Sequence, residues 1–401
     1  MRILQLCNKV PYPPKDGGCI AMNNLTQGLL KEGHAVKVLA INTPKLNVDV
    51  KDLPAEYRAQ TNIEAVFIDT AVKVVPSFIN LFTSESYNIA RFYSPEFEAK
   101  LIEVLEKDTY DIVQLESLFV SMYIPAIRRH SKAKVVLRAH NIEHRLWERN
   151  ADTAAKFLKK KYFSFLAGRL KQYELGVLNS YDAVAAITPQ DAAWFSANGF
   201  TKPLSVIPFG MDLSSIHRKS SITEDKASVF HIGAMDWKPN MEGVSWFLEK
   251  VWDKVLMQQP DVKLYLAGRN MTAELKNLKR RNVEVLGEVA DAHQFILSKG
   301  LMIVPLLSGG GMRVKLIEGM ALGKVVLSTT VGAEGVECED GMNILIADDP
   351  ADFAAVIGKY LSDQNHLAAI GVRAKQFAAE YYNNDDISRK LSLFYRSLVQ
   401  Q

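Results

Sequence analysis

Residues 301–329 read LMIVPLLSGGGMRVKLIEGMALGKVVLST, and this stretch decides the fold. An apolar run ends at Leu307, a glycine loop follows from Ser308 to Met312, helix-forming residues begin near Arg313, and a second apolar run begins at Lys324. Short apolar runs on both sides of a helix are typical of parallel strands joined by a crossover helix. The stretch therefore predicts a strand–helix–strand unit in a parallel sheet.

Similar apolar runs recur in two series along the chain. The first series covers residues 2–7, 35–41, 63–68, 111–116, 133–140 and 182–188, and the second covers 229–234, 262–268, 283–287, 301–307, 324–329 and 343–347. Helical patterns fill most of the gaps, so we predict an α/β fold with two Rossmann-like, doubly wound parallel sheets facing a cleft. The expected domains are 1–205 and 229–380, with a polar linker at 206–228 and a C-terminal helix at 381–401 whose placement the sequence leaves open.

The composition is that of a globular protein with 401 residues, of which 48% are apolar and 23% charged. The formal net charge of +3 is too small to indicate nucleic-acid binding. Cys7, Cys19 and Cys338 have no CxxC spacing, which fits a reducing compartment and neither a disulfide framework nor a zinc site. The sequence shows no signal peptide and no apolar run long enough to span a membrane, so we expect a cytoplasmic protein.

The glycine loop has the composition of an anion site. Backbone N–H groups at a strand's carboxyl end and at a helix N-terminus attract anions, and glycine lets a ligand approach closely. Arg313 and Lys315 suit phosphate oxygens, while Glu318, one turn further on, can accept hydrogen bonds from ribose hydroxyls. The pattern favours a nucleotide site over a flexible loop with solvated charges. Its predicted backbone contacts are Gly309, Gly310, Gly311 and Met312.

The segment VPLLSGGGMRVKLIEGMALGKVVLSTTVGAEGV, residues 304–336, resembles the donor-binding segment of retaining glycosyltransferases of family 4 (group 1 type). The resemblance implies the GT-B fold and sugar transfer from a nucleotide sugar. That family has two glutamates separated by seven residues; Glu318 matches the second, and Gly310 stands at the first. In branches of the family that have glycines at this position, the resemblance implies that backbone amides replace the side chain of the first glutamate. The identity of the donor sugar is therefore harder to infer from this sequence.

Three other segments are similar to the same family. VIPFGMD, residues 206–212, resembles the end of its N-terminal domain, and residues 231–247 resemble the first strand and loop of its donor domain. Ala234 stands where much of the family has a diphosphate-binding arginine, which leaves Lys238 as the nearby cation. Residues 283–291 resemble the loop that reads the base. The implied base contacts are Gly287, Glu288 and Val289.

The N-terminal series carries further candidate residues at strand ends. Residues 8–25 lack GxGxxG, which argues against an NAD site, and the resemblance implies that Gly17 and Gly18 lie near the donor phosphates and the acceptor. The alternative is a simple helix-entry loop. His140 ends a predicted strand, where an imidazole can orient a hydroxyl or meet a developing charge, and it is the predicted catalytic histidine. Weaker acceptor candidates are Glu116, Asn141, Glu143 and His144.

Residues 156–174, KFLKKKYFSFLAGRLKQYE, place lysines and an arginine beside aromatic residues. As a helix, the part from Lys156 to Lys171 could contact an anionic membrane at its inner face or a lipid-linked acceptor. The alternative is a solvated helix that covers a core. Nucleic-acid binding has no supporting motif.

These patterns predict a metal-independent, retaining glycosyltransferase without a cofactor, acting on a glycan or lipid-linked acceptor in polysaccharide or glycoconjugate assembly. No predicted strand ends in a D-x-D metal motif, so Arg313, Lys315 and the loop N–H groups would stabilise the leaving diphosphate. Two alternatives stay open: a nucleotide-sugar epimerase on the same fold, and a non-catalytic nucleotide-sugar-binding module. The base, the sugar, the acceptor and the oligomeric state are not readable from the sequence.

Overall fold

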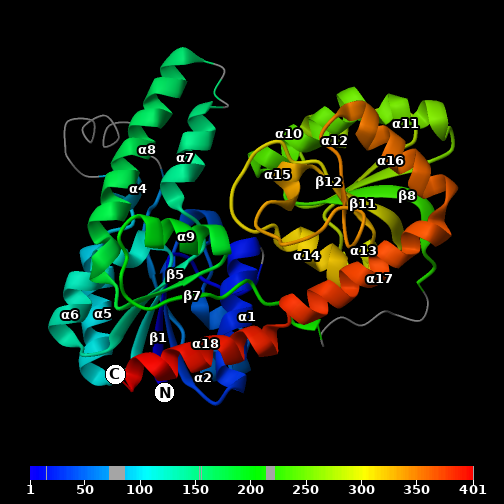
Figure 1. The fold of residues 1–401 in the computed structure, drawn as a ribbon. Coiled ribbons are helices and arrows are strands. Elements are labelled where there is room, and N and C mark those ends of the chain that lie inside the picture. The colour runs from blue at the N-terminus through cyan, green and yellow to red at the C-terminus, as the bar shows by residue number, and fades with distance from the viewer. Residues whose placement is uncertain (15, 72–85, 153, 155, 214–221, 401) are drawn as a thin grey trace. The chain divides into compact units, whose positions relative to one another are not determined.

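The computed structural model describes residues 1–14, 16–71, 86–152, 154, 156–213 and 222–400. The side chains of residues 364–366 are not described. The chain forms two compact units (Figure 1). Unit 1 contains Met1–Gly210 and Asn384–Gln401, and unit 2 contains Met211–Asn383. The C-terminal segment therefore returns to unit 1. Residues 214–221 of the predicted linker 206–228 lie outside the described residues.

Unit 1 is built on a parallel sheet of seven strands in the order β3-β2-β1-β4-β5-β6-β7. The first six in chain order coincide with predicted apolar runs, whereas β7 was not predicted. β7 has three half-buried residues, too few to show a period. The strands are β1 Arg2–Cys7, β2 Ala35–Asn42, β3 Glu64–Phe67, β4 Ile112–Glu116, β5 Lys134–Ala139, β6 Ala183–Ala186 and β7 Leu204–Val206.

Helices cover both faces of this sheet. Apolar side chains of α5, α6 and α9 pack on one face, and those of α1, α2 and α18 pack on the other. Both faces of the sheet are therefore buried from solvent, which is why nearly all strand residues are apolar. The helices are α1 Gly17–Lys31, α2 Ala55–Thr61, α4 Tyr87–Ala90, α5 Pro95–Lys107, α6 Ile124–His130, α7 Glu143–Asp152, α8 Phe157–Val177, α9 Pro189–Ala197 and α18 Asn384–Val399, with 3₁₀ turns at Pro44–Leu46, Val50–Asp52, Leu118–Tyr123 and Leu178–Ser180.

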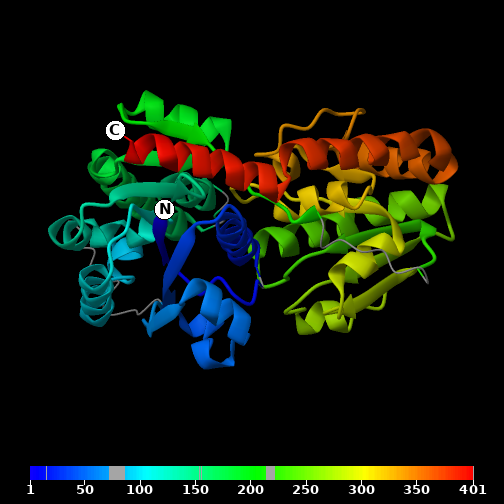
Figure 2. The same cartoon turned by 90° about the horizontal axis from the view of Figure 1, so that it is seen from below.

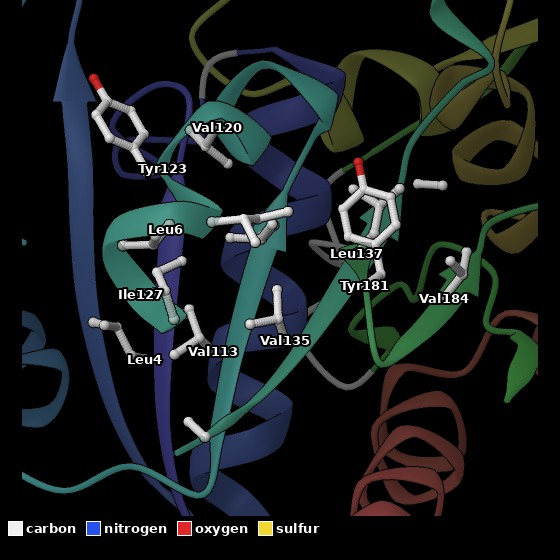
Figure 3. Close-up of a cluster of buried hydrophobic side chains, with 14 of the residues drawn as sticks. Leu4, Leu6, Val113, Val120, Tyr123, Ile127, Val135, Leu137, Tyr181 and Val184 are labelled. Carbon is white, nitrogen blue, oxygen red and sulfur yellow. The ribbon is translucent and has the colours of Figure 1, made fainter. Parts of the chain in front are cut away.

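The core on the first face comes from alternate residues of neighbouring strands. Figure 3 shows Leu6, Val113 and Val135, from β1, β4 and β5, on the side of the sheet that Ile127 of α6 covers. All four side chains are fully buried. Burying each one stabilises the fold by roughly 1.5–3 kcal/mol.

Unit 2 repeats the design with a parallel sheet of six strands in the order β10-β9-β8-β11-β12-β13. Each of these strands lies within or overlaps a predicted apolar run. The strands are β8 Asp225–Ile232, β9 Lys263–Ala267, β10 Val283–Gly287, β11 Lys299–Val304, β12 Val326–Ser328 and β13 Leu345–Ile346. The helices are α10 Lys238–Trp246, α11 Asp253–Gln258, α12 Ala273–Lys276, α13 Ala292–Leu297, α14 Val314–Ala321, α15 Thr330–Ala333, α16 Pro350–Ser362 and α17 Gln364–Tyr381, with a π-helical stretch Phe247–Trp252 between α10 and α11.

The two faces of the second sheet are covered by different helices. Side chains of α10, α11 and α16 form one core with the strands. On the other face, the rings of Phe230 in β8 and Phe295 in α13 lie 5.5 Å apart, edge to face. α14 approaches so closely that a Cβ at Gly319 would lie 2.4 Å from the sulfur of Met302. Glycine at this position therefore lets α14 pack directly on β11.

Each sheet has a switch point, because its first strand lies between two strands whose connections leave in opposite directions. In unit 1, β1 lies between β2 and β4, and in unit 2, β8 lies between β9 and β11. Ligands of open parallel sheets bind outside the carboxyl ends of the strands at this point. We therefore expect the functional residues in the loops that follow β1, β4 and β5 and in those that follow β8 to β11.

The C-terminal helix α18 packs beside α1 on unit 1 (Figures 1 and 2). Its buried residues Ile387, Leu391 and Leu398 join the core between α1 and the sheet. The contact is close at Gly28 of α1, where an added Cβ would lie 1.8 Å from Oγ and 2.6 Å from Cβ of Ser388. A side chain at residue 28 would therefore push α18 away.

Substitution Gly28→Ala should lower the free energy of unfolding by about 1–3 kcal/mol, because the methyl group overpacks the α1–α18 contact. Adding Ser388→Gly should recover part of that loss, since it removes the two atoms that the methyl group meets most closely and leaves only Nδ2 of Asn384, at 3.0 Å. Gly168→Ala in α8 is the matched control, because nothing lies within 4 Å of its added Cβ. Urea unfolding of the native chain and the three variants measures this; equal effects of Gly28→Ala and Gly168→Ala would contradict the close contact.

Candidate functional site

The glycine loop of unit 2 follows β11 and ends where α14 begins. Gly309 has a φ of +109° and Gly311 a φ of +72°, in the left-handed region that glycine adopts without strain. Arg313 is the N-terminal cap residue of α14. The backbone thus turns sharply at the carboxyl end of the central strands, at the position that the sequence predicted.

Arg313 lies beneath this loop instead of projecting from it. Its side chain is buried, and Nη1 donates hydrogen bonds to the carbonyl oxygens of Gly310 and Gly311, the latter at 2.8 Å. The guanidinium carbon lies 5.7 Å from the ring centre of Trp237. The contacts in the structure hold the loop, a role that the sequence did not predict. Direct contact of Arg313 with phosphate stays a prediction.

Lys315 reaches from α14 to the end of β8. Its ammonium donates to Oδ1 of Asn240, and Nδ2 of Asn240 donates to the carbonyl of Ala234 at 2.8 Å. A Cβ at Gly233 would lie 2.7 Å from Nζ of Lys315, so glycine there leaves room for the ammonium. Desolvation, with help from the charge of Arg313, lowers the pKa of Lys315 to about 7, and Glu318 opposes this shift. Asn240 was not predicted.

Glu318 is paired with a histidine that sequence reasoning missed. Nε2 of His293 lies 2.9 Å from Oε1 of Glu318. The hydrogen bond with Glu318 raises the pKa of His293, against a smaller opposing effect of burial. His293 stands in the first turn of α13, where the helix dipole disfavours a cation. That unfavourable position was the one sequence signal for a nearby carboxylate.

The ends of β8, β9 and β10 approach one another through glycines. The N–H of Gly268 donates to the carbonyl of Gly287 at 2.7 Å, and a Cβ at Gly268 would lie 1.7 Å from the carbonyl oxygen of Gly233. No side chain fits at Gly268. Glu288 is exposed and Val289 half-buried directly after β10, where the predicted base contacts were expected.

Lys238 begins α10 and is largely exposed. Its ammonium lies 2.7 Å from Oε1 of Glu242, and the hydroxyl of Ser308 donates to Oε2 of the same carboxylate at 2.7 Å. Glu242 therefore links the start of α10 to the glycine loop. This residue also was not predicted.

The first strand end of unit 1 leads into α1. Gly17 is the first residue of α1, and the capping carboxylate of Asp16 accepts a hydrogen bond from the N–H of Cys19 at 2.9 Å. The ammonium of Lys9 lies 2.6 Å from the same carboxylate, and a Cβ at Gly18 would meet that ammonium at 2.8 Å. The glycine pair thus lies at the carboxyl end of β1, next to a cation that the sequence analysis did not single out.

His140 and Glu116 meet at the ends of β5 and β4. Nε2 of His140 lies 2.7 Å from Oε2 of Glu116. The Glu116 side chain is fully buried, whereas the His140 side chain is 17% exposed. A histidine that is hydrogen-bonded to a buried carboxylate has a defined ring orientation. The two candidates, predicted separately, form one pair.

Glu143 and His144 lie elsewhere than predicted. We predicted acceptor contacts for them, but both side chains are buried between α7 and α8. Their N–H groups donate to the carboxylate of Glu174 in α8, and Nδ1 of His144 lies 2.6 Å from Oε2 of Glu174. Burial, with the nearby charge of Glu174, raises the pKa of Glu143 to about 8. The prediction that Glu143 and His144 contact the acceptor was therefore wrong. Asn141, the remaining candidate of this segment, lies before α7 and is half-buried.

The predicted basic helix is α8, which packs against α7 as a pair extending from the sheet of unit 1 (Figure 1). Phe157 is 67% exposed and Leu158 81% exposed. The ammonium of Lys161 lies 4.7 Å from the ring centre of Phe157, and the guanidinium carbon of Arg169 lies 4.7 Å from that of Phe165. Cationic side chains thus lie beside exposed apolar side chains along the first part of α8.

The described residues hold neither a membrane-spanning helix nor a cluster of metal ligands. No helix in this part of the chain is both long and apolar enough to cross a membrane. Within the same residues, His, Cys, Asp and Glu side chains form no cluster of three that could hold a metal ion.

Two family models match successive parts of the chain. The model described as Glycosyltransferase Family 4 matches residues 17–215, and the model described as Glycosyl transferases group 1 matches residues 226–363. Glycosyltransferase family models thus match the chain over most of its length. The match to group 1 contains the glycine loop, Lys315 and Glu318, and the match to Family 4 contains Glu116 and His140.

The similarity to known proteins covers nearly the whole chain. An "uncharacterized 44.6 kDa protein in cps region" of Klebsiella pneumoniae is 23% identical over 400 residues, covering 96% of this chain and 97% of that protein. The crystal structure of Anabaena Alr3699/HepE in complex with UDP has a TM-score of 0.69 at 16% identity, covering 99% of this chain and 100% of that one. Sucrose-phosphate synthase from Thermosynechococcus elongatus has a TM-score of 0.73 at 16% identity, covering 99% of both chains. The predicted fold class is confirmed.

The lowered pKa of Lys315 predicts a pH-dependent contribution to stability. Between pH 7 and the ordinary lysine value of 10.5, the unfolded chain holds a proton on Lys315 that the folded chain has released, so stability rises with pH in this window. Lys315→Met should remove this rise, at roughly 1 kcal/mol per pH unit. The measurement is urea unfolding at pH 7.5, 8.5 and 9.5, with the exposed Lys254→Met as control; parallel pH profiles of the native chain and Lys315→Met would contradict the shift.

Proposed function

We propose that this chain is a retaining glycosyltransferase that takes its sugar from a nucleoside-diphosphate sugar without a metal or cofactor. The acceptor would be a glycan or a lipid-linked molecule in polysaccharide or glycoconjugate assembly. One observation carries the proposal: Lys315 and the left-handed glycines of the loop lie at the carboxyl ends of β8 and β11, and Glu318 is close enough to Lys315 to act on its pKa. Retention of the anomeric configuration rests on the sequence resemblance.

The diphosphate would bind at the loop and the first turn of α14. N–H groups of the loop and the helix N-terminus favour an anion there. Lys315, held by Asn240, adds a cation whose pKa of about 7 would rise on binding phosphate. These groups are in place before the sugar leaves, so they stabilise the negative charge that develops on the diphosphate. Arg313 contributes by holding the loop carbonyls, and Lys238 by its position at the start of α10.

The nucleoside would bind beside the diphosphate, toward β10. Glu318 accepts from the ribose hydroxyls in this proposal, and His293 keeps its carboxylate in position. Gly287, Glu288 and Val289 follow β10 and would contact the base through their backbone. The similar Anabaena Alr3699/HepE structures are complexes with UDP and with UDP-glucose, which makes uridine the first base to test.

Catalysis would involve the His140–Glu116 pair of unit 1. The buried carboxylate keeps the imidazole oriented, so His140 would be placed to meet a donor hydroxyl or developing charge. Gly17 and Gly18 would let the donor phosphates or the acceptor approach the start of α1. In the mechanism we favour, the leaving phosphate takes the acceptor's proton.

Two alternatives use the same donor site. A nucleotide-sugar epimerase would convert its substrate with no acceptor present. A non-catalytic module, suggested by Gly310 and Ala234 at positions where relatives carry charged residues, would bind nucleotide and release no sugar. Product analysis with and without acceptor separates the three functions.

Substitution Glu318→Ala should weaken nucleotide binding by on the order of 1.5–3 kcal/mol, because a charged hydrogen bond to ribose is lost. Calorimetry with UDP, GDP, ADP, CMP and dTDP in EDTA identifies the base first, and the variant is then titrated with the nucleotide that binds. Exposed Glu249→Ala is the matched control. An unchanged affinity in folded Glu318→Ala would refute this placement of ribose, and binding that requires metal would refute metal independence.

The start of α8 should bind anionic membranes, because its exposed lysines and aromatic residues combine charge attraction with apolar insertion. Charge reversal at Lys159, Lys160 and Lys161 to Glu should lower binding to phosphatidylglycerol vesicles more than tenfold. The control reverses the exposed Lys250, Lys254 and Lys276 of unit 2. Co-sedimentation measures both; equal losses, or equal binding to phosphatidylcholine, would contradict a specific contact through α8.

A further inference from the structure

A line of polar side chains runs through the core of unit 1, beneath α18. Gln114 and Glu116 alternate with apolar residues on β4 and therefore point to the same face of the sheet. That face is the one covered by α1 and α18, and both side chains are buried. Buried polar groups are costly unless each has a partner, so their contacts need a reason.

The contacts form an unbroken chain from the C-terminal helix to His140. The hydroxyl of Tyr395 in α18 donates to Oε1 of Gln114 at 2.5 Å. Nε2 of Gln114 donates to Oε1 of Glu116, and Oε2 of Glu116 lies 2.7 Å from Nε2 of His140. Three hydrogen bonds thus join α18 to the catalytic candidate.

The direction of each bond follows from the one before it. The amide oxygen of Gln114 only accepts, so the Tyr395 hydroxyl must donate, and the Gln114 NH₂ group is then turned toward Glu116. An ionised Glu116 only accepts, so Nε2 of His140 carries a hydrogen, and in the neutral ring Nδ1 is then the nitrogen without one. The buried Arg138, whose guanidinium donates to the carbonyls of Ala185 and Pro208 at 3.2 and 2.8 Å, interacts electrostatically with Glu116. The chain therefore selects one tautomer of His140.

Packing alone does not require the hydroxyl of residue 395. The ring of Tyr395 is buried among apolar neighbours of α18 such as Leu391 and Leu398, and phenylalanine would fill the same space. Without the hydroxyl, the Gln114 amide can rotate and present its oxygen to Glu116, which would repel the carboxylate. Glu116 would then lose its fixed position and with it the control of His140.

We infer that Tyr395 and Gln114 are positioning residues, through which the C-terminal helix holds Glu116 and keeps His140 in the Nε2–H tautomer for turnover. The turnover part rests on the proposed function, whereas the tautomer part stands by itself. The inference predicts that the C-terminal helix contributes to the chemistry of unit 1 as well as to its packing.

The test is Tyr395→Phe in the full chain, read by ¹⁵N NMR of labelled histidine rings, with the His140 signal assigned by its loss in His140→Ala. We expect the Nδ1 and Nε2 shifts of His140 to move from the Nε2–H pattern toward a tautomer mixture. Gln114→Met is the second variant and should do the same. Tyr181→Phe is the matched control, because it removes a buried hydroxyl bonded to Ser121 at 2.7 Å, away from this chain. A His140 tautomer unchanged in both variants would overturn the inference.

Turnover supplies the second readout. With the donor and acceptor that support transfer, Tyr395→Phe should lower kcat about tenfold or more, approaching His140→Ala, and leave the nucleotide Kd unchanged. Tyr181→Phe should keep the native kcat at a similar loss of thermal stability. A shifted tautomer with native kcat, or equal losses in the two tyrosine variants, would overturn the positioning role. Failure of the proposed function would appear differently, as no transfer by the native chain while the tautomer shift remains.

Discussion

Parallel pairing of strands is the constraint on which both units depend. Because every strand pair in the two sheets is parallel, each connection must cross a face of the sheet, and all carboxyl ends collect at one edge. In unit 1 this edge brings Glu116 and His140 together from neighbouring strands. In unit 2 it brings Gly233, Gly268 and the glycine loop together. Residues far apart in sequence become neighbours without any local signal.

The same edge lies at the border of the dry core, so its charged groups are partly removed from water. Each one that we describe has a partner: Lys315 has Asn240, Glu318 has His293, and Glu116 has both Gln114 and His140. Desolvation explains why the pKa of Lys315 falls to about 7 and that of Glu143 rises to about 8. Groups held this way are oriented before a ligand arrives, which is what electrostatic catalysis requires.

The sequence predicted those elements whose buried residues follow a regular pattern within a short segment. The strand β1 is apolar on both faces because both faces are covered, and its run of six residues was visible in the sequence. Prediction failed for β7, whose three half-buried residues have no period, and for Glu143, which is buried because α8 packs on α7. Asn240 and His293 were missed because each supports a predicted residue from a different helix.

The sequence by itself determined the α/β class, the two series of strands, the glycine loop before α14 and the residue types that stand at the strand ends, because hydrophobic period and backbone freedom are properties of short segments. Only the tertiary structure decided which donor meets which acceptor. Tyr395 and Gln114 are 281 residues apart, and their hydrogen bond exists because α18 packs beside α1 over β4. Such a bond depends on strand order and helix packing to within a few tenths of an ångström, and no local pattern in the sequence encodes that.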